Sequence, residues 1–263
     1  MIKRLLSIIG LLNILLDIKY WYASYTLAKN DYVFAPRQLK TKFYLPLVKT
    51  DFIQRGIFAT KTYYEVFSLS FVTKEWNGGA ISTFIKERVV FDIGANIGNH
   101  TLYFLNECDA KYVYCFEPAS DTFDMLKKNI GINHLDNRVK LINAGVGASS
   151  GFGGVKSVKG NTGFTKIEPS ENGSIKILAI DEMDIPEPIG LVKIDVEGFE
   201  VEVLRGMMET IKKFHPYIMI EIDGENYETV CSILEGIGYQ HLPVHQHSGS
   251  TDNHLFYHPE LIS

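Results

Sequence analysis

The chain has 263 residues, enough for one α/β domain with an additional segment, and its hydrophobic content of 46% supports a sizeable core rather than disorder. The 26 basic and 31 acidic residues leave a net charge of −5 without any basic block, which argues against a nucleic-acid substrate. The three cysteines are odd in number and lack metal-ligand spacing, so we expect ordinary buried or half-buried thiols in a cytoplasmic protein.

The N-terminal segment is strongly apolar. Lys3 and Arg4 precede residues 5–16, in which polar side chains recur at helical spacing, and this pattern predicts an amphipathic helix. At ~1.5 Å per residue the run is too short to cross a hydrocarbon core of ~30 Å. The helix could pack on the catalytic domain, form a homodimer contact or lie on the inner face of a membrane. The bulky residues 20–22 disfavour a cleaved signal peptide.

Residues 41–87 form a predicted small element between this helix and the main domain. Residues 42–48 and 57–60 have the composition of short strands around a polar connection. Aromatic side chains in this element could stack on a sugar ring, although core packing is their commoner role. The predicted organisation is a helical segment, 1–40, a β-containing cap element, 41–87, and a main domain, 88–263.

The stretch VVFDIGANIGNHT, residues 89–101, predicts a strand that enters a tight loop and then a helix. In an open parallel sheet, ligands bind outside the carboxyl ends of the strands, where this loop lies. Gly94 and Gly98 lack Cβ atoms, so the backbone can turn sharply and a ligand can approach. Asn96 replaces the second glycine of a dinucleotide site. Asp92, at the strand end, suits a ligand with an ammonium group.

Two further strand ends complete the predicted cofactor site. Glu117 follows the strand 112–116, where a carboxylate can accept hydrogen bonds from both hydroxyls of a ribose. After the strand 139–142, Ala144 leaves room for an adenine ring and Asn143 could bond its edge, although an ordinary turn explains both residues equally well. These features together favour S-adenosylmethionine as the ligand.

A glycine-rich stretch, residues 145–174, follows the third strand and predicts a long loop of the kind that forms lids or binding loops. Its residues 161–163, Asn-Thr-Gly, could reach the pocket. Beyond it, strand alternation places Lys193 and Asp195 on one face, with Asp195 at the carboxyl edge. Glu221 lies near the end of the next predicted strand.

Three strings resemble the FkbM family of S-adenosylmethionine-dependent methyltransferases: FDIGANIG at 91–98, FEP at 116–118 and, most family-specific, KIDVEGFE at 193–200. The similarity covers roughly residues 60–240. It implies a class I methyltransferase fold and methylation of a hydroxyl, often on a sugar or polyketide-type product. The implied cofactor-binding residues are Asp92, Gly94, Ala95, Asn96, Gly98, Thr101, Glu117, Pro118, Asn143, Ala144 and Asp195.

The periodicity of the main domain predicts an α/β fold with a mostly parallel seven-stranded sheet and helices on both faces. The last two strands are joined without a helical pattern, so the final strand should be antiparallel. The expected strands are 89–93, 112–116, 139–142, 190–195, 217–222, 239–242 and 253–257, and the expected helices lie near 98–107, 119–132, 200–213 and 225–237.

Methyl transfer to a hydroxyl calls for a base or a metal beside the acceptor. Asp195 is the first candidate base, Glu197 and Glu221 are candidate pocket acids, and Lys193 and His100 are further candidates. Three of them have a structural alternative. Asp195 could cap a helix, Glu197 could interact favourably with the dipole of the following helix, and Lys193 could neutralise a buried acid.

Metal sites are less well supported by the sequence. The carboxylates at the strand ends could hold Mg²⁺, but no dedicated ligand spacing is visible. Five of the eight histidines lie after residue 240, without the paired spacing of a zinc site, so a polar loop and strand edge explains them better. His254 could nevertheless point toward the acceptor.

The leading prediction is therefore an O-methyltransferase that acts on a saccharide or related natural product. An NAD-linked oxidoreductase and a non-catalytic, membrane-associated binding module are the alternatives. The missing glycines count against the oxidoreductase, and the set of Asp92, Glu117 and Asp195 counts against the non-catalytic module.

Overall fold

A computed structural model describes residue 16 and residues 18–76, 79–157, 165–169, 173–242 and 251–261. The chain divides into two compact units, one that ends at Tyr64 and one that begins at Glu65. The boundaries predicted at residues 40 and 87 stay a prediction, as do the proposed roles of the helix 5–16, which lies almost entirely outside the described residues. Within the described part of the chain, no helix is both long and apolar enough to span a bilayer.

The first unit contains helical residues 18–28, the antiparallel strands β1 (Val33–Phe34) and β2 (Phe43–Tyr44), and α2 (Phe52–Thr60). The strand predicted at 57–60 is wrong, because these residues form the end of α2. Asp51 caps this helix by accepting a hydrogen bond from the Gln54 N–H at 2.8 Å, and Ile57 is fully buried. The cap and the helical spacing of the apolar residues outweigh the β-branched composition.

The second unit is built on a seven-stranded sheet with the order β14-β15-β13-β12-β5-β6-β7. All neighbours pair in parallel except at β15, which is antiparallel to both strands beside it. The predicted class I methyltransferase layout with a reversed final strand is therefore confirmed. The strands are β5 (Val89–Ile93), β6 (Tyr112–Phe116), β7 (Val139–Ile142), β12 (Ile189–Ile194), β13 (Tyr217–Asp223), β14 (Gln240–Leu242) and β15 (Thr251–Tyr257).

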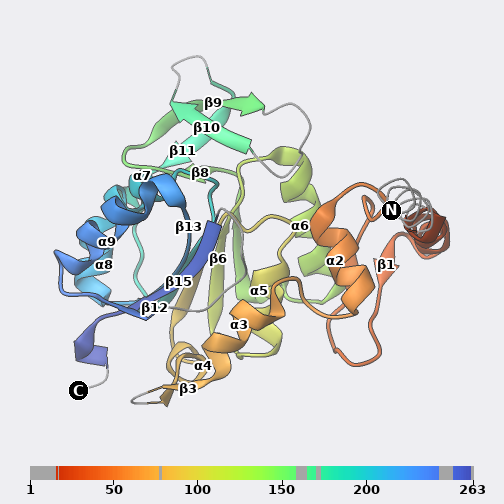
Figure 1. The fold of residues 1–263 in the computed structure, drawn as a ribbon, viewed down its shortest axis with the longest axis horizontal. Coiled ribbons are helices and arrows are strands. Elements are labelled where there is room, and N and C mark those ends of the chain that lie inside the picture. The colour runs from red at the N-terminus through yellow and green to blue at the C-terminus, as the bar shows by residue number, and fades with distance from the viewer. Residues whose placement is uncertain are drawn as a thin grey trace, which may run out of the picture. The chain divides into compact units, whose positions relative to one another are not determined.

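Helices cover both faces of this sheet, with α7, α8 and α9 together on one face and α5 and α6 on the other (Figure 1). The helix predicted at 200–213 is interrupted at Gly206, where a Cβ would lie 1.8 Å from the carbonyl oxygen of Gly147. The helices are α3 (Val66–Thr73), α4 (Ile81–Ile85), α5 (Asn99–Asn106), α6 (Ser120–Ile132), α7 (Glu200–Arg205), α8 (Met208–Phe214) and α9 (Tyr227–Glu235), and a short hairpin, β3 (Glu75–Trp76) and β4 (Gly79–Ala80), precedes α4.

A second, four-stranded sheet replaces the long loop predicted at 145–174, so that prediction is wrong. Its order is β10-β9-β11-β8, and Figure 1 shows it beyond one end of the main sheet. Ile175 and Ile177 point inward from alternate positions, which is the pattern of a half-buried strand that the neighbouring glycines obscured. Residues 161–163 lie outside the described residues. The strands are β8 (Gly145–Val146), β9 (Gly151–Ser157), β10 (Thr165–Pro169) and β11 (Ile175–Leu178).

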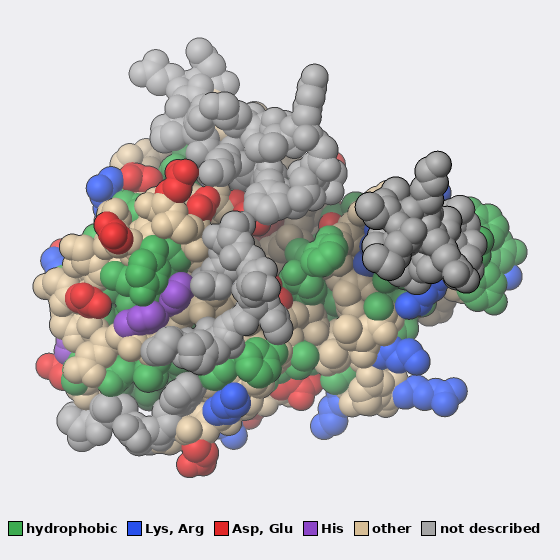
Figure 2. Space-filling model, in the orientation of Figure 1, with side chains coloured by type: hydrophobic (Ala, Val, Ile, Leu, Met, Phe, Trp, Pro, Cys, Tyr) green, Lys and Arg blue, Asp and Glu red, His purple; other side chains and the backbone are tan. Residues whose placement is uncertain are grey.

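The core of the second unit lies between the central strands and their helices. Every residue of β5 and β12 is buried, as expected for parallel strands covered on both faces. All three cysteines are free thiols, with Cys108 and Cys115 buried and Cys231 half-buried, which confirms the prediction for them. Figure 2 shows acidic side chains spread over the region of α8 and α9 on one face, in keeping with the net charge.

Candidate active site

A buried lysine joins the carboxyl ends of β5 and β12. The side chain of Lys193 is 4% exposed, and its Nζ donates a hydrogen bond to the Gly94 carbonyl at 2.8 Å. The same nitrogen lies 3.2 Å from an Asp195 oxygen and 3.3 Å from an Asp92 oxygen. The other oxygen of Asp92 accepts a hydrogen bond from the Thr101 hydroxyl at 2.6 Å. The ammonium thus has a hydrogen bond to one carbonyl and ion-pair contacts with two carboxylates, of which the Asp92 oxygen has no hydrogen-bond partner among the described residues.

The charge on Lys193 is stable in this environment. Burial by itself would lower the pKa of an ammonium group, but the charges of Asp195 and Asp92 outweigh burial and raise the pKa of Lys193 above its usual value. The cation therefore persists at neutral pH. Asp92 is fully buried; it pairs with Lys193 and accepts the hydrogen bond from Thr101.

The loop after β5 needs glycine at two positions for packing. Gly94 and Gly98 have φ angles of 77° and 87°, which favour glycine. A Cβ on Gly94 would lie 1.8 Å from the Asp195 carbonyl oxygen, and a Cβ on Gly98 would lie 2.6 Å from the Leu126 Cδ1 atom. The sharp turn predicted from these glycines is present, and the structure adds that they let the loop pack against the segment after β12 and against α6. Ligand approach at these positions stays a prediction.

Glu117, at the end of the neighbouring strand β6, binds the loop after β5. Its two carboxylate oxygens accept hydrogen bonds from the backbone N–H groups of Asn96 and Ala119, both at 2.9 Å. The N–H groups of Gly94 and Ala95 both donate to the Phe116 carbonyl at 3.0 Å. A carboxylate has about four acceptor positions, so Glu117 can still accept two hydroxyls. Burial raises the pKa of Glu117 to about 7, although both backbone hydrogen bonds act to lower it.

Asn143 closes the same edge of the sheet after β7. Its amide nitrogen donates to the carbonyls of Glu117 at 2.8 Å and Pro118 at 3.2 Å, and Ala144 beside it is buried. These bonds fix the turn after β6, a structural role that the sequence did not indicate. Adenine contact by Asn143 and Ala144 stays a prediction.

Acidic side chains crowd the ends of β12 and β13. Asp195 is partly open to solvent, with 27% of its side chain exposed, and Glu197 follows in a left-handed conformation with φ of 51°. Burial and the charges of Asp195 and Glu221 raise the pKa of Glu197 to about 8. Burial is the largest cause of this shift, and the neighbouring acids add to it. A cationic ligand beside these acids would lower the pKa again.

Glu65 belongs to this acidic group and was missed by the sequence reasoning. It precedes α3 in a left-handed conformation with φ of 53°. Burial and the charges of Glu221 and Asp195 raise its pKa to about 7. Glu65 lies 24 positions before β5 in a region without a motif, so no local signal marks it.

The sequence profile described as the Methyltransferase FkbM domain matches residues 92–247, more than half of the chain. The chain belongs to the FkbM methyltransferase family. This FkbM domain begins at Asp92 and includes Glu117, Lys193, Asp195 and Glu221, so the profile spans the strand ends described above.

Curated relatives of this FkbM protein include methyltransferases from an archaeon and a fungus. Hexuronic acid methyltransferase AglP of Haloferax volcanii is 33% identical over 143 residues, which cover 52% of this chain and 56% of that protein. Methyltransferase sdnD of Sordaria araneosa is 27% identical over 156 residues, or 46% of this chain and 60% of that protein. The matches therefore span a little more than half of these relatives.

Among solved structures, a methyltransferase FkbM from Methylobacillus flagellatus KT superposes with a TM-score of 0.48 and 20% identity. The alignment covers 66% of this chain and 44% of the other. The fold class of this FkbM protein rests on its own strand order, which was described above.

One acid of the family-specific block is structural in this FkbM domain. Glu200 is 1% exposed, and its two oxygens accept hydrogen bonds from the Gly198 N–H and the Asn226 amide, both at 2.6 Å. Glu200 therefore fixes the turn between β12 and α7 and is not open to a ligand. Glu197, on the preceding turn, has no such role in the described structure.

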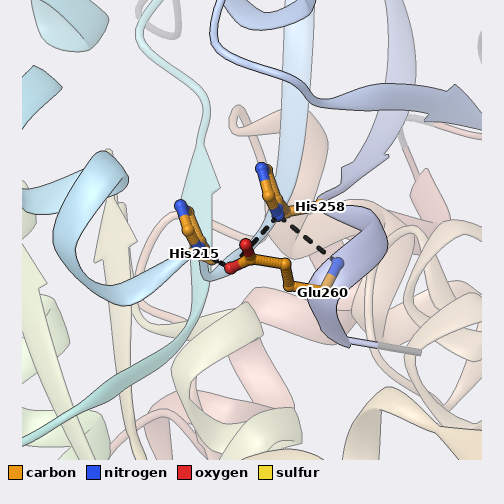
Figure 3. A group of neighbouring side chains, drawn as sticks. All are labelled: His215, His258 and Glu260. Carbon is orange, nitrogen blue, oxygen red and sulfur yellow. Dashed lines mark hydrogen bonds and ion pairs between the residues drawn. The ribbon is translucent and has the colours of Figure 1, made fainter. Parts of the chain in front are cut away.

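A second cluster lies at the opposite edge of the sheet, where His215 precedes β13 and His258 follows β15 (Figure 3). Nδ1 of His215 is 2.8 Å and Nδ1 of His258 is 3.9 Å from one oxygen of Glu260. The imidazole rings are stacked at 3.8 Å and 5° from parallel. Since an imidazole binds a metal in its ring plane, both rings cannot hold one ion in this arrangement.

The C-terminal histidines of β14 and β15 also contact one another. Nε2 of His241 is 2.8 Å from Nδ1 of His254. His254 also packs against the ring of Tyr227. These contacts agree with the polar strand edge predicted from the sequence. The suggestion that His254 reaches the acceptor stays a prediction.

Proposed function

We propose that this FkbM protein is an S-adenosylmethionine-dependent O-methyltransferase that acts on a hydroxyl of a saccharide or related natural product. The observation that carries the proposal is a set of carboxylates at the ends of β5, β6 and β12. Lys193 contacts those of Asp92 and Asp195, and Glu117 accepts a hydrogen bond from the loop after β5. The family and the methyltransferase relatives support the reaction class. The hexuronic acid substrate in the name of the Haloferax relative supports a saccharide acceptor.

The residues of the site fit S-adenosylmethionine. This molecule carries an ammonium group, a positively charged sulfur and a ribose diol, and when bound it supplies an electrophilic methyl group. The acids that, after burial, raise the pKa of Glu197 suit a cation. The acceptor positions left on Glu117 suit the diol.

The three acids of the cofactor site have separate roles in this proposal. Glu117 accepts the ribose hydroxyls and holds Asn96 in the loop. Asp195, the partly open acid beside Lys193, faces the positively charged methionine end. Asp92 acts through Lys193 and Thr101 rather than by direct contact, because it is fully buried.

The chain accelerates the reaction mainly by placement. Transfer from sulfur to oxygen is a direct displacement, so nucleophile, carbon and sulfur must lie in line, with reacting atoms ~3–3.5 Å apart. Lys193 fixes the loop after β5 and the turn after β12 relative to one another, since it contacts both. Glu197 and Glu221 bound the acceptor side. The Mg²⁺ considered from the sequence gains no support from the comparisons, and the proposal does not require it.

Binding of S-adenosylmethionine by calorimetry tests this function. We expect binding by the wild type and by the exposed control Asp121→Ala, and none by Asp92→Ala, which leaves Lys193 without one of its partners. Equal affinity for all three proteins would show that the site lies elsewhere. A wild type that binds but never transfers a methyl group would favour the non-catalytic binding module. The methyltransferase family match sets the NAD-linked oxidoreductase aside.

A further inference from the structure

Glu65 and His100 meet at the open end of the proposed site. Oε2 of Glu65 lies 3.6 Å from Nε2 of His100, which is too long for a hydrogen bond. Glu65 comes from the residue before α3, and His100 lies in the first turn of α5. The two side chains thus arrive from different elements at the edge where the cofactor loop ends.

His100 provides an independent sign that something binds between them. The residue is 7% exposed, and its Nε2 atom finds no hydrogen-bond partner among the described residues. A buried polar atom without a partner is unfavourable by about 1–3 kcal/mol unless a ligand or water satisfies it. An oxygen beside the pair, at the apex of a triangle whose base is the 3.6 Å separation, could lie at hydrogen-bond distance from both Nε2 and the Glu65 carboxylate.

The two side chains also differ in their pKa values. Burial and the nearby charge of Lys193 lower the pKa of His100 to about 3, so its ring is neutral and holds one proton. Around Glu65, burial and the acids Glu221 and Asp195 raise the pKa, and Lys193 and the amide of Asn253 lower it, with a result of about 7. A general base works best when its pKa lies near the working pH.

Asp195 is less suited to this role than the sequence suggested. Its carboxylate lies 3.2 Å from the buried Lys193 ammonium, which also holds Asp92. Protonation of Asp195 during the reaction would leave that cation with one charged partner fewer inside the protein, which is costly. Glu65 has no lysine or arginine within ion-pair distance in the described structure, and so avoids this penalty.

We propose, within the methyl transfer proposed above, that Glu65 is the catalytic base and accepts the proton of an uncharged acceptor hydroxyl bound between Glu65 and His100. The hydroxyl oxygen forms a bond to the methyl carbon, the bond from that carbon to sulfur breaks, and its electron pair stays on sulfur. The proton moves to Glu65, so one positive and one negative charge disappear together. His100, the positioning residue, donates from Nε2 to the same oxygen.

The charges around the pair define the acceptor class. Glu65, Glu197 and Glu221 bound this end of the site, and the cation that faces them, Lys193, is already occupied by Asp92 and Asp195. Glu65 must be ionised to accept the proton, and an anionic group beside the reacting oxygen would raise its pKa further and so oppose the reaction. The acceptor is a hydroxyl compound that is neutral or cationic near its reacting oxygen.

The test combines Glu65→Gln with the exposed control Glu87→Gln and with His100→Asn in the full-length protein. Calorimetry with S-adenosylmethionine reports cofactor binding. Infrared spectra of protein labelled with ¹³C-glutamate follow carboxyl titration from pH 5 to 9 without any acceptor. Transfer of tritiated methyl from S-adenosylmethionine is measured against glucose, glucosamine, glucuronic acid and a deproteinised extract of the source cells.

We expect Glu65→Gln to bind S-adenosylmethionine within about twofold of the wild type but to transfer methyl at least about 100-fold more slowly. Glu117 and Glu197 also titrate in this range, so the Glu65 carboxyl is read from the difference between spectra: the wild type minus Glu65→Gln should contain one carboxyl that titrates near pH 7, and the wild type minus Glu87→Gln should not. The transfer rate should rise with pH through the same midpoint, and His100→Asn should raise KM more than it lowers kcat. Labelled products should be neutral or cationic next to the methylated oxygen.

Transfer by Glu65→Gln within a few-fold of the wild type, a Glu65 carboxyl that titrates below pH 5, or a labelled product with an anionic group next to the methylated oxygen would each overturn the proposal. Bound cofactor without transfer to any probe or extract component would overturn it as well. Failure of the wild type to bind S-adenosylmethionine would instead reject the methyltransferase function itself.

Discussion

Lys193 keeps its charge while almost completely buried, because Asp92, Asp195 and the Gly94 carbonyl surround its ammonium group. Ion pairs of this kind add little to stability when compared with a well-packed apolar core, but removing one partner leaves the other charge unpaired inside the protein. At the scale of single residues, the site therefore depends on a charge balance rather than on any one contact.

Replacing Lys193 by Met tests this balance. Asp92 would remain fully buried without its cation, so we expect Lys193→Met to lower the free energy of unfolding by about 3–5 kcal/mol. Lys176→Met, at an exposed position of β11, is the matched control and should change it by less than about 0.5 kcal/mol. Urea denaturation measures both, and similar small effects would mean that Asp92 is satisfied in another way.

Glu117 should make cofactor affinity depend on pH. Its carboxylate must be ionised to accept both ribose hydroxyls, and its pKa is about 7, so affinity should rise about tenfold from pH 6 to pH 8. Glu117→Gln should bind more weakly and lose this dependence. Calorimetry with S-adenosylmethionine at the two pH values provides the comparison, and an unchanged pH dependence in the variant would exclude Glu117 as its source.

At the scale of elements, the site is made where β5, β6 and β12 end and their loops pack on one another. The loop after β5 and the segment after β12 approach so closely that Gly94 has no space for a side chain. Asn143, after β7, holds the turn after β6 through two carbonyls. These contacts join segments that are far apart in the sequence.

Substitutions at two glycines can distinguish a steric clash from backbone strain. Gly94 and Gly79 both have positive φ, of 77° and 116°, but a Cβ on Gly94 would clash with Asp195, whereas a Cβ on Gly79 would meet nothing within 4 Å. We expect Gly94→Ala to lower the melting temperature clearly more than Gly79→Ala, and to abolish S-adenosylmethionine binding that Gly79→Ala retains. Equal losses in thermal denaturation would attribute both effects to strain alone.

At the scale of the whole molecule, the acidic edge makes stability depend on pH. Glu65, Glu117 and Glu197 have pKa values raised to between about 7 and about 8, so the folded protein binds more protons than the unfolded chain above pH 4.5. Their contribution is fully favourable below pH 4.5 and is lost as pH rises toward 8. His100, with its lowered pKa, has the opposite effect and destabilises the fold as pH falls below 6.5.

The substitution Glu197→Gln measures the contribution of Glu197 to this pH dependence. Glutamine keeps the shape but not the charge, so the variant should melt about 2–4 °C higher than the wild type at pH 9, a gain on the order of 1 kcal/mol. No gain is expected at pH 4.5, where the wild-type carboxyl is protonated in the folded state. Glu235→Gln, at an exposed position of α9, serves as the control. A gain that is equal at both pH values would contradict this origin.

The strand–loop–helix run around Asp92, the acid at Glu117 and the positions of the seven strands along the chain could be predicted from the sequence, because hydrophobic periodicity and turn residues act locally. The same local signals misled at 57–60, where a helix cap overrides β-branched composition, and at 145–174, where glycines hide paired strands. Local patterns identify an element well when its own residues decide its conformation.

Only the tertiary structure decided which side chains share the site. It placed Lys193 between two aspartates, committed Glu200 to a turn and brought Glu65 to His100 from a segment without a motif. Burial and the charges of distant neighbours set the protonation of these groups, and neither quantity is present in the order of the residues. The sequence by itself determined the family and the scaffold, and the fold determined the chemistry at its edge.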